Sequence, residues 1–460
     1  MSVPRLMLAG VEPGPAVGLV AGALIAGLDE RRTVRPIMLG LDVPLFRVLY
    51  ATAAKAPRVV DPVLHGQTAA AELCEYWAEN VAMTVFVAAL PALDRWEGVE
   101  TSRPVDFAER FDAPVVLVLD ARERGATATA AVHGVRALAR RADIAGLVVV
   151  GADESAAGKE LMETLRRDVA LPVLGHIPPQ LSEQFARQQA AITSGAVRTV
   201  GPKPAPGSDA RLCKEAASYL QLDEFDAIAA RRGYLPAVQR RLLVPDAAAA
   251  GLTLAVAWGP PLQPLALENI DILQAMGVEL APLNIARDRE LPDGVDGLFI
   301  AGQADEHQLG AFADNGGLLT TLVAAIGEGL PTLALGGGAL LLMRGLADSR
   351  GRSHELAGVV PAEAELMESY DRPRYVKVAA TRANPYDEGE NLLYELFDLE
   401  FLMLEQESFA YRVEMGGEAA QAEGFAVSRC LASTLYPSFA HSPAMVGRFV
   451  AAMRLGVQWH

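Results

Sequence analysis

The stretch 331-PTLALGGGALLL-342 decides the fold of the second half of this chain. An apolar run enters the consecutive glycines Gly336, Gly337 and Gly338, and another apolar run follows them. This pattern predicts a buried strand, a tight turn and the start of a helix. In α/β enzymes a strand-to-helix turn of this kind often presents a nucleophile. Because no Ser, Cys or Thr stands in the turn, the sequence predicts the architecture of a nucleophile elbow without a nucleophile.

The rest of the second half repeats the alternation of strands and helices. Its apolar runs are continuous, which is typical of strands that are buried on both faces of a parallel sheet. Strands are predicted at 252–258, 278–283, 296–302 and 331–336, and helices near 265–276 and 316–329. A second α/β domain is therefore expected over 251–460.

The first half shows the same alternation, with strands predicted at 5–10, 34–39, 82–87, 114–120, 145–151 and 172–177. Helical stretches lie between them, such as 126–142. The segment 235–251 carries two prolines and an alanine run, and it separates the two halves. The expected fold class is α/β, with two tandem three-layer domains over 1–240 and 251–460.

Composition and charge narrow the function classes. The 460 residues are 51% hydrophobic and 21% charged, which is typical of a globular protein. A net charge of −17 disfavours general nucleic-acid binding, which needs a basic surface. The apolar stretch 16–28 is too short to span a bilayer and is interpreted as a buried helix. We expect a cytoplasmic protein that binds neither nucleic acid nor membrane, and a homo-oligomer is compatible with the sequence.

The cysteines Cys74, Cys213 and Cys430 are scattered along the chain, without a CxxC pair. Neither a disulfide framework nor a metal site is expected from this spacing.

The loop 10-GVEPGPAVG-18 lies between the first predicted strand and the first predicted helix, where a phosphate-binding loop belongs. Gly10 and Gly14 supply glycines, but Val17 stands where a lysine clamp is expected. Gly18 stands where a hydroxyl for Mg²⁺ is expected, and two prolines remove N–H donors. The sequence predicts a degenerate loop that binds nothing, with an anion at the helix N-terminus as the alternative. ATP and Mg²⁺ are not expected as cofactors.

Several segments resemble the cobyrinic acid a,c-diamide synthase family, glutamine-dependent amidotransferases that use ATP to amidate tetrapyrrole side-chain carboxylates. In the family's order, over nearly the whole chain, these segments are 113-APVVLVLDAR-122, 145-AGLVVVG-151, 171-LPVLGHIP-178, 268-ENIDILQAMGVELAPLNIARDRELPDGVDGLFIAG-302 and 354-HELAGVVP-361. The resemblance implies a dethiobiotin-synthetase-like P-loop-type domain followed by a class I glutamine amidotransferase-like domain. It also implies that, in active members, a Cys on the elbow hydrolyses glutamine and the ammonia attacks an acyl phosphate made in the first domain.

The resemblance places changed residues at the catalytic positions. In 334-ALGGG-338, Gly336 stands where the family has its nucleophilic Cys. In 433-STLYPSF-439, Tyr436 and Ser438 replace the family's histidines, so Ser438 occupies the position of the general base. Glycine cannot carry an acyl group, and neither serine nor tyrosine supplies a base at neutral pH. No catalytic residue is therefore expected.

A few charged family positions survive. Asp42, in 40-GLD-42, stands where the family has an aspartate, and Asp120 ends a predicted buried strand, at the edge where open α/β sheets bind ligands. We interpret them as the residues to test for ligand contact, with helix capping or loop hydrogen bonding as the alternative. The family's HEFH box at 394-YELF-397 keeps only Glu395.

These changes favour a non-catalytic homologue that binds a tetrapyrrole or corrinoid-type ligand or a partner protein. A second hypothesis is ATP-dependent amidation of tetrapyrrole carboxylates in which ammonia replaces glutamine. A third is a structural subunit of a larger complex. The clamp, the nucleophile and the base are all changed, in both predicted domains, which favours the first and third hypotheses over the second.

Overall fold

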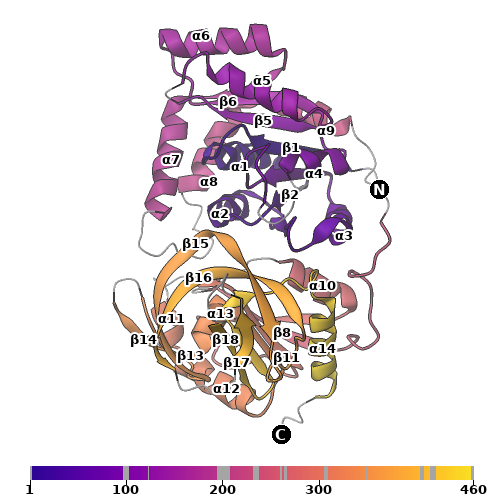
Figure 1. The fold of residues 1–460 in the computed structure, drawn as a ribbon, viewed down its shortest axis with the longest axis vertical. Helices are drawn as coiled ribbons and strands as arrows, with labels where there is room; N and C mark the ends of the chain where they lie inside the picture. The colour runs from indigo at the N-terminus through magenta and orange to yellow at the C-terminus, as the bar shows by residue number, and fades with distance from the viewer. Residues whose placement is uncertain are drawn as a thin grey trace. The chain divides into compact units, whose positions relative to one another are not determined.

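The computed structural model describes residues 3–96, 103–122, 124–193, 208–231, 238–259, 262–263, 267–304, 309–348, 351–404, 409–414 and 421–456. Contacts between residues divide the chain into two compact units (Figure 1). The first unit holds Met1–Ile192 and Lys203–Gln239, and the second is built on Arg240–His460. No helix of the described residues is long and apolar enough to cross a membrane.

The first unit contains a seven-stranded sheet of order β3-β2-β4-β1-β5-β6-β7, in which every pairing is parallel. Its strands are β1 Arg5–Gly10, β2 Val34–Leu39, β3 Arg58–Val60, β4 Met83–Ala88, β5 Val115–Asp120, β6 Ile144–Val150 and β7 Val173–Ile177. The six predicted strands are confirmed to within about a residue at each end. The sequence analysis missed β3, because its three residues are too few to form a recognisable apolar run.

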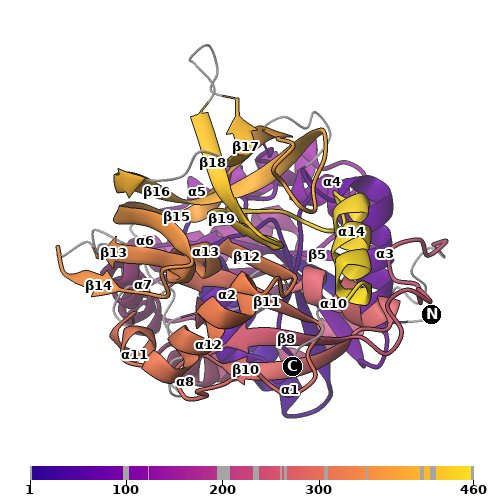
Figure 2. The ribbon, with the colours of Figure 1, turned by 90° about the horizontal axis from the view of Figure 1, so that it is seen from below.

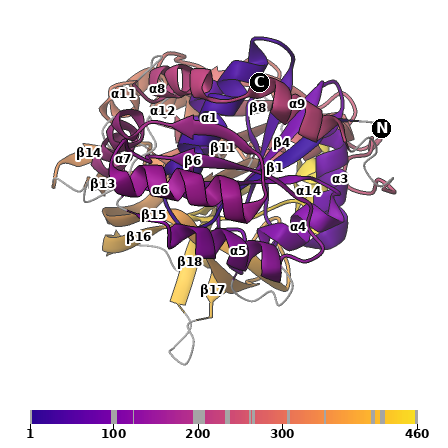
Figure 3. The same cartoon turned by 90° about the horizontal axis from the view of Figure 1, so that it is seen from above.

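Helices cover both faces of this sheet. They are α1 Ala16–Asp29, α2 Val43–Thr52, α3 Gly66–Ala78, α4 Pro104–Arg110, α5 Ala128–Leu138, α6 Ala156–Thr164, α7 Pro179–Thr193, α8 Ser208–Ala216 and α9 Leu222–Ala230, with the π-helix η1 Leu165–Val169 and the 3-10 helix η2 Ala217–Tyr219. Helices α5 and α6 lie on one face of the sheet, and α1 and α8 on the other (Figure 3). The predicted apolar helix at 16–28 is α1, and it is buried almost all round, as its composition requires.

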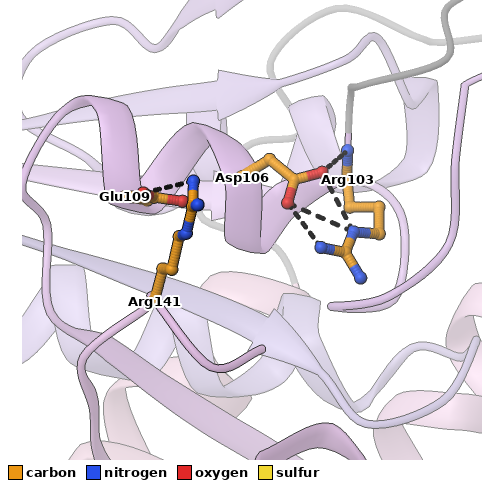
Figure 4. A network of polar contacts seen from close by, with 4 residues as sticks. All are labelled: Arg103, Asp106, Glu109 and Arg141. Atoms are coloured by element: carbon orange, nitrogen blue, oxygen red, sulfur yellow. Dashed lines mark hydrogen bonds and ion pairs between the residues drawn. The ribbon is translucent and has the colours of Figure 1, made fainter. Parts of the chain in front are cut away.

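A polar network fixes the start of α4 (Figure 4). The guanidinium of Arg103 donates two hydrogen bonds to Asp106, at 2.9 Å from Nε and 2.6 Å from Nη2, and the Arg103 backbone N–H donates a third at 3.0 Å. Because Asp106 lies in the first helical turn, it satisfies an N–H group that has no partner within the helix. Glu109 and Arg141 form a looser ion pair of 3.8 Å beside it.

The second unit contains a sheet of order β10-β8-β11-β12-β19-β18-β17-β15-β13-β14, with β9, β16 and β20 attached beside this path. The strands are β8 Thr253–Trp258, β9 Leu262–Gln263, β10 Glu279–Asn284, β11 Gly297–Ala304, β12 Thr332–Gly336, β13 Met343–Ala347, β14 Ser353–Glu355, β15 Val360–Ala380, β16 Glu390–Leu404, β17 Phe409–Val413, β18 Gln421–Val427, β19 Cys430–Ser433 and β20 Leu435–Tyr436. The pairings from β10 to β19 by way of β8, β11 and β12 are parallel. The predicted α/β character of this half is therefore confirmed.

The helices of the second unit are α10 Glu268–Met276, α11 Leu309–Ala313, α12 Gly316–Gly327, α13 Gly337–Leu342 and α14 Pro443–Arg454. Helices α10 and α14 lie together on one side of the parallel strands, and α12 lies on the other (Figure 2). The long antiparallel pair β15–β16 was not predicted. Its sequence mixes charged and apolar residues without the continuous apolar run that marked the other strands.

Candidate functional site

The predicted elbow exists in the second unit. Strand β12 ends at Gly336, between β11 and β19, and helix α13 begins at Gly337. Gly336 has φ 59° and ψ −124°, a backbone conformation that residues other than glycine rarely adopt. This sharp strand-to-helix turn is the geometry that presents a nucleophile in α/β enzymes. Here a glycine occupies its tip.

The space beside Gly336 is filled. A β-carbon on this residue would lie 2.9 Å from the carbonyl oxygen of Gly302, 3.2 Å from Cδ1 of Leu396 and 3.3 Å from Cδ2 of Tyr436. Both side chains are buried, and Leu396 is 0% exposed. Strands β16 and β20 position them, since Tyr394 pairs with Tyr436. A longer side chain at residue 336 would meet these groups within its first atoms.

The next two glycines have a different role. A β-carbon on Gly337 would lie 2.3 Å from the backbone nitrogen of Ala304, and one on Gly338 would lie 1.8 Å from the carbonyl oxygen of Ile300. Only glycine allows the helix to approach strand β11 this closely. The three glycines are thus required by the backbone turn and by packing, which explains the elbow sequence without chemistry.

The segment of the predicted base is held by a buried amide. Asn269, on α10, donates from Nδ2 to the carbonyl oxygen of Pro437 at 2.8 Å and accepts from the N–H of Phe439 at 2.8 Å. Ser438 lies between these contacts, and it is 1% exposed. Burial raises the pKa of Tyr436 well above its ordinary value, and the charge of Glu268 raises it further. The Tyr436 phenol therefore stays protonated and cannot act as a base at neutral pH.

Two polar groups near the elbow were not singled out from the sequence. Glu423, on β18, accepts hydrogen bonds from the Ser433 hydroxyl at 2.7 Å and from the Thr434 N–H at 2.8 Å. Ser433 pairs with Leu335, the residue before the turn. Burial raises the pKa of Glu423. Gln303 follows Gly302 on β11 and is 0% exposed, and neither of its side-chain polar atoms has a hydrogen-bond partner among the described residues. A single Glu or Gln in a strand does not reveal from the sequence whether its side chain is buried or what it contacts.

Cys430 does not replace the missing nucleophile. It pairs with Thr332, at the other end of β12, roughly 13 Å along the strand from Gly336. Burial raises the pKa of its thiol to about 12, so the thiolate is not formed at neutral pH. Within the residues that the structure describes, no group of three or more metal-ligating side chains comes together.

In the first unit, the loop that the sequence predicts to be degenerate lies between β1 and α1. The side chain of Val17 is 8% exposed, and its Cγ2 lies 3.0 Å from where a β-carbon on Gly10 would stand. An apolar group therefore occupies the base of the loop, at the position expected for a lysine clamp. Gly18 faces Leu45 and Phe185 of the neighbouring helices, and Gly14 has φ 150°.

Carboxylates lie at this loop. The Oδ2 atom of Asp120 lies 4.0 Å from the β-carbon position of Gly14. Asp120 also accepts from Nε of Arg122 at 2.9 Å, and Glu12, within the loop, forms an ion pair with Arg124. The charges at the loop are thus paired with one another, which does not favour binding of a free polyanion.

Asp42 has the geometry of a helix cap. Its Oδ1 accepts from the N–H of Leu45 at 3.0 Å, at the start of α2. Strands β2 and β5 are separated in the sheet by β4 and β1, so about 14 Å lies between the ends from which Asp42 and Asp120 project. Both residues lie at the carboxyl edge of the sheet, but the structure does not bring them into contact.

Comparisons with known proteins bear on both units. A family model described as a CobB/CobQ-like glutamine amidotransferase domain matches residues 254–444. A cobyrinate a,c-diamide synthase of Caldanaerobacter subterraneus is 21% identical over 94% of this chain and 94% of its own. The enzyme of the same name from Dehalococcoides mccartyi is 23% identical over 98% of both chains. A hydrogenobyrinate a,c-diamide synthase of Stutzerimonas stutzeri is 27% identical over 79% of this chain and 81% of its own.

Among solved structures, a glutamine amidotransferase matches 44% of this chain and 99% of its own, with 17% identity and a TM-score of 0.33. The MinD cell division protein of Aquifex aeolicus matches 52% of this chain and 100% of its own, with 11% identity and a TM-score of 0.31. All three sequence relatives are named a,c-diamide synthases, and the two cobyrinate a,c-diamide synthases match at least 94% of this chain. This chain is therefore a homologue of the cobyrinate a,c-diamide synthases, and it carries a CobB/CobQ-like glutamine amidotransferase domain over residues 254–444.

Proposed function

We propose that this chain is a non-catalytic homologue of the cobyrinate a,c-diamide synthases that binds a tetrapyrrole or corrinoid-type ligand or a partner protein. One observation carries the proposal. At the elbow, where the family resemblance puts the nucleophile, Gly336 has no side chain, and Leu396 and Tyr436 fill the space that one would need. A vacant nucleophile position could be rescued by a nearby group, whereas a filled one leaves no room for the glutamine amide to reach the turn.

The first unit supports the same conclusion independently. Activation of a carboxylate with ATP needs a cation at the phosphate loop and a hydroxyl for Mg²⁺. The loop instead has Val17 packed at its base and the carboxylate of Asp120 at its mouth. The loop residues 10–18 include neither a lysine nor a hydroxyl side chain, so neither half-reaction has its required groups.

Two features favour a binding role over a purely structural one. Gln303 keeps a buried amide without a partner beside the elbow, and each such unsatisfied group costs about 1–3 kcal/mol. A bound molecule that offers a donor or an acceptor would remove this cost. Asp42 and Asp120 lie at the sheet edge where open α/β sheets bind ligands, and we propose them as contacts.

An absorbance titration with cobyrinate tests the ligand-binding half of the proposal. A saturable shift of the corrinoid bands is expected on adding protein. Asp42→Asn is the informative variant, because asparagine caps a helix as well as aspartate does and the fold should be unaffected. Weaker binding by Asp42→Asn with unchanged stability would support a contact. The absence of any spectral change with the wild-type protein would exclude the tetrapyrrole and leave only a protein partner.

A further inference from the structure

We propose that the outer half of the β15–β16 pair is a docking surface for a basic, extended segment of a partner protein. This half, here called the acidic ribbon, consists of residues 360–367 of β15 and 398–404 of β16. Both strands run far beyond the five or six residues of an average strand, and they form the long curved pair in Figure 1. The surface lies outside the elbow, so the proposal does not depend on the loss of catalysis.

Like charges face each other across the acidic ribbon. In the antiparallel register, Glu365 lies opposite Glu400, and Asp398 lies two residues from Glu400 on the same strand. Glu363 precedes Glu365 by two residues and therefore shares its face. Like charges in directly opposite positions destabilise a strand pair. The fold thus maintains an unfavourable arrangement that a cationic partner would relieve.

No cation of this chain offsets these charges within the described residues. The side chains of Glu363, Glu365, Asp398 and Glu400 take part in none of the ion pairs or hydrogen bonds of that part of the structure. Arg374 pairs with Glu395 at 4.0 Å, further along the strands. Burial raises the pKa of Glu395, Arg374 lowers it, and the negative charge of Asp398 raises it again.

Strand β16 also presents a free edge. On one side it pairs with β15 along its length, and on the other its pairing in the described structure is limited to β20, at Tyr394 and Glu395. The backbone N–H and C=O groups of 396–404 therefore have one side available for another strand. Extended segments bind such edges by adding a strand to the sheet.

Apolar side chains accompany the charges. Met367, Phe401, Leu402 and Leu404 are 47%, 40%, 57% and 43% exposed. Edge strands that are protected against association carry charges or prolines and avoid such residues. The combination of carboxylates, exposed apolar groups and a free edge fits a partner strand in which basic and apolar residues alternate. A second copy of this chain fits poorly, because antiparallel self-pairing would bring further carboxylates together on a chain whose net charge is already −17.

The test compares the double variant Glu365→Gln/Glu400→Gln with Glu279→Gln/Glu290→Gln. The control removes two exposed carboxylates from the same unit, one of them on β10 at the far end of the sheet. The ribbon variant should raise Tm by about 2 °C through relief of repulsion, whereas the control should not. The probe for binding is a fluorescein-labelled peptide of alternating lysine and valine, followed by fluorescence anisotropy with the full chain.

The wild type and the control should bind this peptide, and the ribbon variant should bind it at least about tenfold more weakly. A peptide with N-methylated valines should fail, because it cannot pair with the edge. The proposal is overturned by equal Tm values, by no binding to the wild type, or by equal binding of the N-methylated peptide. Self-association of the wild type that the ribbon variant abolishes would also overturn it, since a second copy would then be the occupant.

Discussion

Cδ2 of Tyr436 lies 3.3 Å from the point where a β-carbon on Gly336 would stand. The residue predicted to replace one histidine of the family pattern therefore fills the space at the predicted nucleophile position. The two changes are complementary, because a bulky buried ring is tolerated only where the facing residue has no side chain. A side chain introduced at residue 336 alone would therefore clash with the ring of Tyr436.

Gly336→Cys should destabilise the protein and release no glutamate from glutamine. The positive φ costs about 1–2 kcal/mol for a residue with a β-carbon, and crowding against Gly302, Leu396 and Tyr436 adds to it. Gly358→Cys is the matched control, because Gly358 has φ 71° and no atom within 4 Å of its β-carbon position. Urea denaturation should show a larger loss for Gly336→Cys than for Gly358→Cys. Equal losses would show that the space beside the turn is not filled, and glutamate release would contradict the account outright.

Gln303→Met should stabilise the ligand-free protein by about 1 kcal/mol. Methionine has a similar shape and removes two buried polar atoms that have no partner. The same substitution should weaken binding of any ligand that bonds to the amide. Thermal unfolding with and without cobyrinate measures both effects. A loss of stability in the ligand-free variant would mean that the amide is satisfied, for example by buried water, and would remove one support for the binding role.

The pH dependence of stability should differ in sign between Glu423 and Asp106. Burial raises the pKa of Glu423, so the folded protein holds its proton where the unfolded chain has lost it. The free energy of unfolding therefore falls as pH rises from the ordinary carboxyl pKa through the raised one. Glu423→Gln does not titrate, and its stability relative to wild type should increase as pH rises through that window.

Asp106 behaves in the opposite way. Burial raises its pKa, but the hydrogen bonds from Arg103 outweigh this and lower the pKa below its ordinary value. Its contribution to stability is present above the ordinary pKa and is lost as pH falls through the lowered one. Asp106→Asn should therefore be less stable than wild type at neutral pH and approach it in acid. Urea denaturation between about pH 3 and pH 8 follows both variants, and parallel curves for the two would contradict the assigned environments.

Val17→Lys should not create a nucleotide site. The lysine would replace a buried apolar side chain, and the carboxylates of Asp120 and Glu12 already have arginine partners. We expect a loss of stability of about 1–3 kcal/mol and no binding of a fluorescent ATP analogue. Micromolar nucleotide binding by this variant would show that only the clamp is missing from the loop.

Much of the fold could be predicted from the sequence because parallel strands that are buried on both faces leave continuous apolar runs. Strands β1, β5 and β12 are of this kind, and the turn after β12 is marked by its glycines. Strands β15 and β16 mix charged and apolar residues and face solvent in part. They therefore lack the continuous apolar run by which the other strands were predicted.

For the candidate site, the sequence predicted which residues stand at the family positions but not how those residues pack together. The spacing of 334-ALGGG-338 and 433-STLYPSF-439 located Gly336 and Ser438, but it could not show that Leu396 fills the space between strands far apart in sequence. Glu423 and Gln303 gave no signal, because the role of a polar residue in a strand depends on the partners that the tertiary structure brings to it. Asp42 was named as a position to test for ligand contact, with helix capping as the alternative, and its cap to Leu45 is visible only in the structure.

A single assay can establish whether the protein lacks amidation chemistry. Purified full-length protein is incubated with ATP, Mg²⁺ and cobyrinate, first with glutamine and then with ammonium, and ADP release is followed through a coupled enzyme. The account predicts no cobyrinate-dependent ADP with either nitrogen source, because the loop after β1 lacks a cation clamp and the turn at Gly336 lacks a nucleophile. ADP release that depends on cobyrinate and is accompanied by an amidated product would contradict it.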